Sequence, residues 1–157
     1  RERVNEIMHD SRLGTYGVTA LTLGLLIRVG LIVSLVDLGH SFALIMGTGF
    51  ASGKMAIIVT RKLFNPSYLA KTGSIIGYIS AKSILYATLI WLVPVILFLS
   101  FFSILLGLVF VATAVCFLGF RANHYLGGIT GDVLGAIAFA SELLFLLGIL
   151  SIFTGVP

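Results

Sequence analysis

Five long runs of apolar residues alternate with short polar connections along this chain, and none shows the apolar and polar alternation of a half-buried strand. No charged side chain occurs between Lys82 and Arg121. This stretch holds two membrane crossings, because about 20 apolar residues already span the hydrocarbon core. The pattern predicts five transmembrane segments, at residues 17–36, 41–60, 83–99, 104–120 and 133–153, with a turn near residues 100–103.

The fold predicted from this pattern is an all-α, polytopic membrane bundle. In lipid only helices and closed barrels satisfy every backbone polar group, and continuously apolar runs exclude the barrel. Ahead of the first segment, Val4, Ile7 and Met8 recur at helical spacing among charged neighbours. They predict a short amphipathic helix over residues 1–11 that lies on the membrane surface. No internal repeat or biased tract divides the sequence, so residues 1–157 are expected to form one transmembrane domain.

Composition and charge add a direction to this bundle. Hydrophobic residues make up 59% of the chain, charged residues 10%, and the mean hydropathy is +1.14. The basic residues of the connections all fall on one side: Arg1, Arg3, Arg12, Arg61, Lys62, Lys71, Lys82 and Arg121. Short cytoplasmic connections are rich in Lys and Arg. We therefore expect this face to be cytoplasmic in a bacterial or archaeal cytoplasmic membrane, with His40 and the C-terminus outside. Two explanations of the basic face stay open. One is membrane topology together with attraction to anionic lipid, and the other is a role in handling phosphate groups.

Two glycine-containing stretches lie on the basic face, and each leads into a predicted helix: "HDSRLGTYG" at residues 9–17 and "RANHYLGGITGDVLGA" at residues 121–136. Such stretches suit phosphate. The NH groups at a helix start carry partial positive charge, glycine allows close approach, and Arg12 or Arg121 can add charge-assisted hydrogen bonds. The plainer alternative is that the glycines only turn the chain and let helices pack closely.

Asp10 and Asp132 stand beside these glycines. A carboxylate repels a nearby phosphate unless a metal ion or a hydrogen-bond donor lies between them, so the combination favours an active site. Capping of the last helix is the alternative for Asp132. The histidines do not have the spacing of a metal site on one helix, and the sequence has no P-loop.

The segments "EIMHDSRLGTYG" (residues 6–17), "LGGITGDVLGA" (126–136) and "SELLFLL" (141–147) closely resemble the cobalamin synthase family, adenosylcobinamide-GDP ribazoletransferase. The resemblance implies a membrane phosphotransferase of cobalamin biosynthesis. In its reaction, a ribose hydroxyl of α-ribazole or its 5′-phosphate attacks the pyrophosphate of adenosylcobinamide-GDP, and GMP leaves. Magnesium is the implied cofactor. The implied partners are the two substrates and the lipid bilayer, without nucleic acid, and a homo-oligomer is left open.

Within these motifs, Asp10, Arg12 and Asp132 are the expected catalytic residues, and Asp132 is also a candidate metal ligand. The expected phosphate-binding residues are Arg121, Gly127, Gly128, Thr130 and Gly131. Family members carry an aspartate-rich stretch of the DGxxDxxDG kind just upstream of the first motif, and this sequence starts after it. We therefore expect the main metal ligands to lie upstream, in a larger enzyme of which this is the C-terminal part. The chain by itself is expected to be inactive.

Arg28, Lys54 and Glu142 are charged residues inside predicted spans, and they raise a rival hypothesis, a transporter or small-molecule binding module. Against it, the sequence shows no pair of related halves, and its glycine-rich segments lie at the membrane interface instead of the midplane.

The depth of these charges predicts a structural role. Arg28 lies eleven residues after Gly17 and Glu142 ten residues after Asp132, which places both ~15–16 Å deep at 1.5 Å per residue. A lone charge there costs at least ~2.5–3.5 kcal/mol, so we predict that Arg28 pairs with Glu142 and that the first and last spans are neighbours. Lys54, roughly 9 Å deep, is expected to reach the headgroups. In the alternative, Glu142 lines a polar ligand cavity by itself.

Overall fold

The structure is a computed structural model that describes residues 14–67 and 80–153. These residues form five helices: α2 (Thr15–Asp37), α3 (Phe42–Leu63), α4 (Ala81–Phe98), α5 (Phe101–Leu126) and α6 (Gly131–Phe153). All five are long and apolar enough to cross a membrane. The chain is therefore an integral membrane protein with the predicted all-α fold. The amphipathic helix predicted at residues 1–11 lies outside the described residues.

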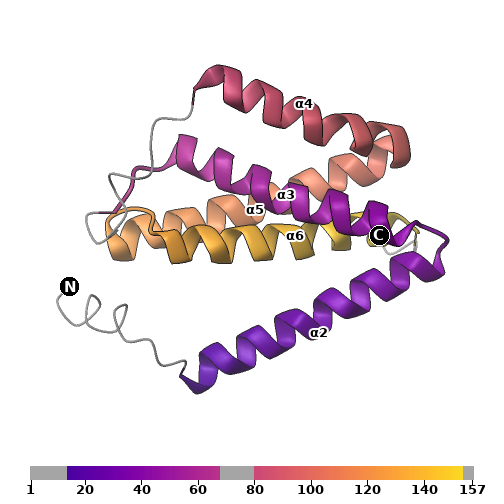
Figure 1. The fold of residues 1–157 in the computed structure, drawn as a ribbon. Helices are drawn as coiled ribbons and strands as arrows, with labels where there is room; N and C mark the ends of the chain where they lie inside the picture. Colours follow the sequence, from indigo (N-terminus) through magenta and orange to yellow (C-terminus); the bar gives the residue numbers. More distant parts are fainter. Residues whose placement is uncertain (1–13, 68–79, 154–157) are drawn as a thin grey trace.

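Successive helices run in opposite directions, and α3, α5 and α6 form the middle of the bundle, with α4 on one side and α2 on the other (Figure 1). Helix α6 packs against α3, α5 and α2, so it is the central element. Helix α2 approaches the others at its C-terminal end and diverges from them toward its N-terminal end (Figure 1). Consistent with this divergence, residues 15–23 of α2 are all exposed.

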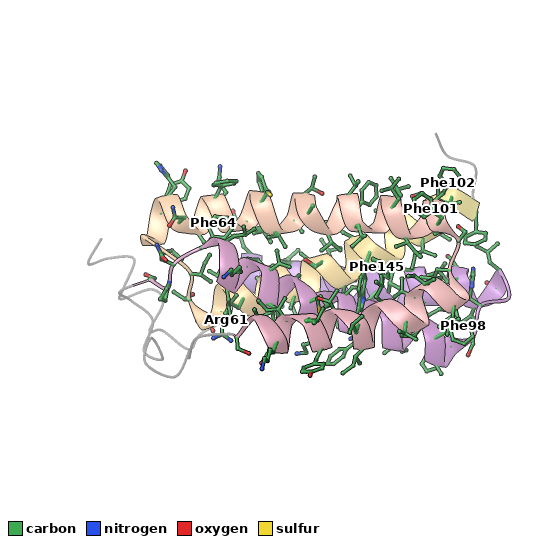
Figure 2. The ribbon with its side chains drawn as sticks, turned by 90° about the horizontal axis from the view of Figure 1, so that it is seen from above. Arg61, Phe64, Phe98, Phe101, Phe102 and Phe145 are labelled. Carbon is green, nitrogen blue, oxygen red and sulfur yellow. The ribbon has the colours of Figure 1, made fainter. Side chains whose placement is uncertain are left out.

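Small residues let the central helices approach closely. A Cβ atom on Gly53 of α3 would lie 2.6 Å from the carbonyl oxygen of Ala138, and one on Gly148 would lie 2.6 Å from the Cα atom of Gly107. The ring of Phe145 fills the space beside Gly107 and is completely buried between the helices (Figure 2). Because lipid gives no hydrophobic drive to helix association, such close van der Waals contacts hold a membrane bundle together.

Several span ends differ from the prediction by a few residues, most of all those of α5. The turn predicted at residues 100–103 is shorter, because α5 already begins at Phe101, and the Ser100 hydroxyl caps it by accepting a hydrogen bond from the Ser103 NH group at 3.2 Å. At its other end α5 continues past residue 120 to Leu126, through polar residues that keep the helical conformation. Gly127 ends the helix in the left-handed conformation, with φ 66°.

Candidate active site

A four-residue join, residues 127–130, connects α5 to α6, and we call it the glycine lip. Gly127 and Gly128 have φ values of 66° and 147°, which other residues rarely adopt. The second half of the glycine-containing stretch at residues 121–136 is helical, because α6 begins at Gly131. The end of the bundle that carries the lip is called the lip end below.

The glycine lip is hydrogen-bonded to the segment that follows α3. The Ile129 NH group donates to the carbonyl oxygen of Asn65, and the Ser67 NH group donates to the carbonyl oxygen of Ile129, both at 2.9 Å. The Ser67 hydroxyl donates to the carbonyl oxygen of Leu126 at 2.6 Å. A Cβ atom on Gly128 would lie 2.6 Å from the Ser67 backbone nitrogen. Gly128 thus allows close approach of the chain's own backbone, and the lip is fixed to the end of α3.

Thr130, not Asp132, caps α6. The buried Thr130 hydroxyl accepts a hydrogen bond from the Val133 NH group at 3.4 Å, the N-cap pattern. Asp132 is exposed in the first helical turn. Gly131 is also exposed, and a Cβ atom added to it would meet nothing within 4 Å. The first NH groups of a helix lack acceptors within it. Gly131 therefore offers an open backbone at a helix start, where an anion could bind.

Arg61 lies beside the lip, whereas the sequence indicated only that it is one of the basic residues that orient the bundle. Its half-buried side chain lines a small hollow together with Phe64, Pro66, Ile129 and Leu134. Figure 2 shows Arg61 and Phe64 at the same end of the bundle. This position follows from the pairing of residues 65–67 with the lip. The pairing joins segments about 60 residues apart, so no local sequence pattern indicates it.

Arg121 has an aromatic environment. Its guanidinium carbon lies 5.2 Å from the ring centre of Tyr125 and 5.8 Å from that of Phe117, and all three side chains are exposed. These distances are within the range of cation–π contacts. The role of Arg121 in phosphate binding stays a prediction.

The predicted intramembrane ion pair is present. Arg28 Nη2 lies 2.6 Å from Glu142 Oε1, and the two side chains are 25% and 8% exposed. Near this pair, α2 crosses α6 closely, because a Cβ atom on Gly24 would lie 2.6 Å from the ring of Phe139. The predicted pairing and the predicted contact between the first and last spans are confirmed.

Whether Lys54 reaches the headgroups stays a prediction. Its neighbour Gly53 contacts Ala138, seven residues or about 10 Å from the start of α6, which agrees with the predicted depth of roughly 9 Å. The Lys54 ammonium nitrogen lies 4.7 Å from the ring centre of Phe50, one turn farther from the lip. This distance is within the range of a cation–π contact.

The remaining predicted residues, Asp10 and Arg12, lie outside the described residues. Among residues 14–67 and 80–153, no group of three or more His, Cys, Asp and Glu side chains could hold a metal ion. In this part of the chain the lip end offers one exposed carboxylate, that of Asp132. The described residues therefore do not form a magnesium site by themselves.

Comparison with known proteins identifies the family. A family model described as cobalamin-5-phosphate synthase matches residues 1–150. The chain belongs to this family. Two curated relatives from Clostridium botulinum, both named adenosylcobinamide-GDP ribazoletransferase, are each 33% identical to it. The relative from strain Langeland aligns over 148 residues, which are 94% of this chain and 59% of the relative. The relative from strain Okra aligns over 153 residues, which are 97% and 61%. The chain thus spans about three fifths of the length of these members of the family. No solved structure matches it.

Proposed function

We propose that this protein is a membrane phosphotransferase of cobalamin biosynthesis, which joins adenosylcobinamide-GDP to α-ribazole or its 5′-phosphate and releases GMP. The observation that carries the proposal is the 33% identity, over 94% of the chain, to a relative named adenosylcobinamide-GDP ribazoletransferase. The family description, cobalamin-5-phosphate synthase, favours the phosphorylated acceptor. The names of the family and of these relatives describe synthesis and group transfer, so they do not favour the transporter hypothesis.

The geometry of the lip end supports phosphoryl transfer. Gly131 and Asp132 present the first NH groups of α6 beside an open glycine surface, and Arg61 stands next to the lip. An anion bound there would gain from the helix dipole and from a charge-assisted hydrogen bond. In phosphoryl transfer the protein contributes mainly positioning and charge stabilisation, which is what these groups can supply.

In the proposed reaction, a ribose hydroxyl oxygen forms a bond to the phosphorus that carries the cobinamide group. The bond from that phosphorus to the bridging oxygen breaks, and GMP leaves with the electron pair. The hydroxyl proton passes to a carboxylate, for which Asp132 and Asp10 are the candidates. Arg121, Gly127 and Gly131 remain proposed phosphate-binding residues, and Arg12 and Arg61 are added to them. Gly128 and Thr130, which are buried and hold the lip and the start of α6 in place, are proposed as positioning residues instead.

Magnesium is retained in the proposal because phosphoryl transfer from a diphosphate develops charge that a divalent cation neutralises. Asp132 is the one described residue at the lip end that can serve as its ligand. A single carboxylate does not make a magnesium site. We also propose that the lip end faces the cytoplasm, from the one-sided basic residues of the connections.

Turnover by the complete protein in proteoliposomes tests the proposal. Release of GMP from adenosylcobinamide-GDP is expected to depend on α-ribazole or its 5′-phosphate. Asp132→Asn and Arg12→Ala should each lower turnover at least tenfold, about 1.4 kcal/mol of barrier. Asp37→Asn is the matched control, since Asp37 is exposed at the opposite end of the bundle.

Three outcomes would contradict the proposal or one of its residues. GMP release without an acceptor would indicate a hydrolase. Uptake of substrate into vesicles without GMP formation would indicate a transporter. Near-normal turnover of Asp132→Asn, with the variant folded in the membrane, would leave Asp132 as a surface residue of the first turn of α6.

A further inference from the structure

A cavity of about 180 Å³ lies between α3, α4 and α5, and its lining residues differ from those of the candidate active site. Its floor is buried and includes Ser52 of α3, Trp91 of α4 and Val115 of α5. Its rim is exposed and includes Leu63 of α3 and Ala112 of α5. The cavity therefore opens on one side to the surroundings of the bundle, which in a membrane are lipid chains.

The cavity exists because α4 diverges from α5. The two helices meet at the short turn between Phe98 and Phe101, and they separate toward the lip end (Figure 1). Figure 2 shows the same separation from above. Trp91 Nε1 donates a hydrogen bond to Ser52 Oγ at 2.9 Å, which holds α4 against α3. This contact closes the end of the cavity that is farthest from the lip, so the open side lies between the lip-end halves of α4 and α5.

The lining of the cavity does not suit water. Ser52 carries the one hydroxyl in this lining, which already accepts the hydrogen bond from Trp91 and donates one to the carbonyl oxygen of Thr48 at 2.7 Å. The other lining side chains are hydrocarbon or contain sulfur. A buried water needs two to four polar partners, whereas apolar cavities stay dry and bind apolar molecules. The lining therefore calls for a hydrocarbon ligand.

The cavity has the length of a lipid chain in one leaflet. On α3 its lining runs from Ser52 to Leu63, eleven residues or about 16 Å along the helix axis. On α5 it runs from Leu108 to Cys116, eight residues or about 12 Å. Half of a hydrocarbon core of about 30 Å is about 15 Å. An extended acyl chain from the leaflet at the lip end thus fits the long axis of the cavity.

A cation stands where the headgroup of such a lipid would lie. Lys62 is exposed in the last turn of α3. It follows the lining residues Met55 by seven positions and Val59 by three, which places it within about 20° and 60° of them around the helix. Lys82, which is exposed at the start of α4, lies about 180° from Trp91 and so on the face away from the cavity. Lysines near a membrane surface attract anionic headgroups, and Lys62 is the one placed at this cavity.

We propose that the cavity binds one anionic phospholipid from the leaflet at the lip end. One acyl chain lies between α4 and α5 with its end near Trp91, and the phosphate contacts the ammonium group of Lys62. The chain fills the space that the helices leave open and thereby supports α4 at its distance from α5. A free phosphate has no chain for the cavity, and a zwitterionic lipid has no net charge for Lys62, so the site selects ligands that combine the two features.

The test measures lipid binding to the complete protein in detergent by native mass spectrometry. Dipalmitoyl phosphatidylglycerol and dipalmitoyl phosphatidylcholine are titrated separately, because they share their chains and differ in headgroup charge. We expect one tightly bound phosphatidylglycerol. Lys62→Ala should weaken its binding about fivefold, which is about 1 kcal/mol for one lysine at the membrane surface, and should leave phosphatidylcholine binding unchanged. Ala112→Phe should weaken binding of both lipids at least about tenfold, because the ring occupies the space of the chain.

Two matched controls and one local signal accompany these variants. Lys82→Ala removes an exposed lysine on the far face of α4, and Ala20→Phe adds a ring to an exposed position of α2, so neither should change lipid binding. Phosphatidylglycerol with brominated chains should quench the fluorescence of Trp91, which lines the cavity and is buried from the bulk lipid. Trp91→Phe supplies the background, and Ala112→Phe should abolish the quenching.

The inference is overturned if the wild type binds no phosphatidylglycerol, the result expected when another segment of the complete protein fills the cavity. It is also overturned if Ala112→Phe binds both lipids like the wild type, or if Lys82→Ala weakens binding as much as Lys62→Ala. Displacement of the lipid by glycerophosphate would indicate a plain phosphate site, and displacement by α-ribazole a substrate pocket, and either result contradicts the inference. None of these measurements involves turnover, so the proposed function is tested separately.

Discussion

The Arg28–Glu142 ion pair gives the sharpest stability prediction for this bundle. Three variants define a double-mutant cycle: Arg28→Met, Glu142→Gln and the two changes together. Each single change leaves one polar or charged group without its partner, whereas the double change removes both charges. The cycle therefore measures the interaction between the two side chains apart from their separate effects on packing.

The structure sets the size of the effects. Breaking a buried ion pair on one side costs about 3–5 kcal/mol, because it leaves a charge uncompensated. Both side chains lie at mid-depth, where exposed surface faces lipid and not water, so exposure does not relieve either unpaired group. Each single change should therefore lower the free energy of unfolding by about 3 kcal/mol. The pair should show a coupling energy of about 2 kcal/mol, within the range for residues in direct contact.

Unfolding of the complete protein in mixed micelles, titrated with a denaturing detergent, provides the four free energies. A coupling energy below about 0.5 kcal/mol would refute the view that the ion pair joins α2 to α6. A second refutation would come from the exchanged variant with Arg28→Glu and Glu142→Arg. If it is no more stable than either single change, the two charges do not stabilise each other.

The fold class and the ion pair could be predicted because lipid imposes strong constraints. A backbone in hydrocarbon must satisfy its own polar groups, so apolar runs of sufficient length become helices. A lone charge at mid-depth is costly, so two opposite charges at one level indicate a contact between their helices. For the helices and for the ion pair alike, the alternative arrangements cost several kcal/mol. Counting residues along the sequence was therefore enough to locate both.

Helix ends could not be predicted, because smaller energies decide them. The segment from Arg121 to Leu126 is polar enough to read as a connection, yet it stays helical until Gly127 adopts a positive φ. Helix α3 likewise extends three residues beyond the predicted end at residue 60, through Arg61 and Lys62, whose charges do not interrupt the helix. The cation–π contact of Lys54 with Phe50 is another feature that no pattern of apolar residues reveals.

The candidate site could be predicted only in part, because some of its features are local in sequence and others depend on contacts between distant segments. The motif located the start of α6 and its open Gly131, because glycine and capping residues act locally. The contact between the lip and residues 65–67 is made by backbone hydrogen bonds. Nearly every residue type can form such bonds, so the contact leaves no pattern in the sequence. Arg61 owes its place beside the lip to this contact, so its possible role became visible only in three dimensions.

Two further predictions concern orientation and the lip. In single-cysteine labelling of intact cells, with Cys116 replaced, cysteines at Lys71 and Arg121 should be protected and one at His40 accessible, because basic connections stay cytoplasmic; external labelling at position 71 or 121 would refute the orientation. Gly128→Ala should lower the free energy of unfolding by at least about 1 kcal/mol, because alanine strains at φ 147° and its Cβ would lie 2.6 Å from a backbone nitrogen that cannot easily move. The control Gly135→Ala lies in a helix with open space around it, so it should be neutral or slightly stabilising in the same detergent titration. Equal stability of the two variants would mean that the contact between the lip and the end of α3 contributes nothing to the fold.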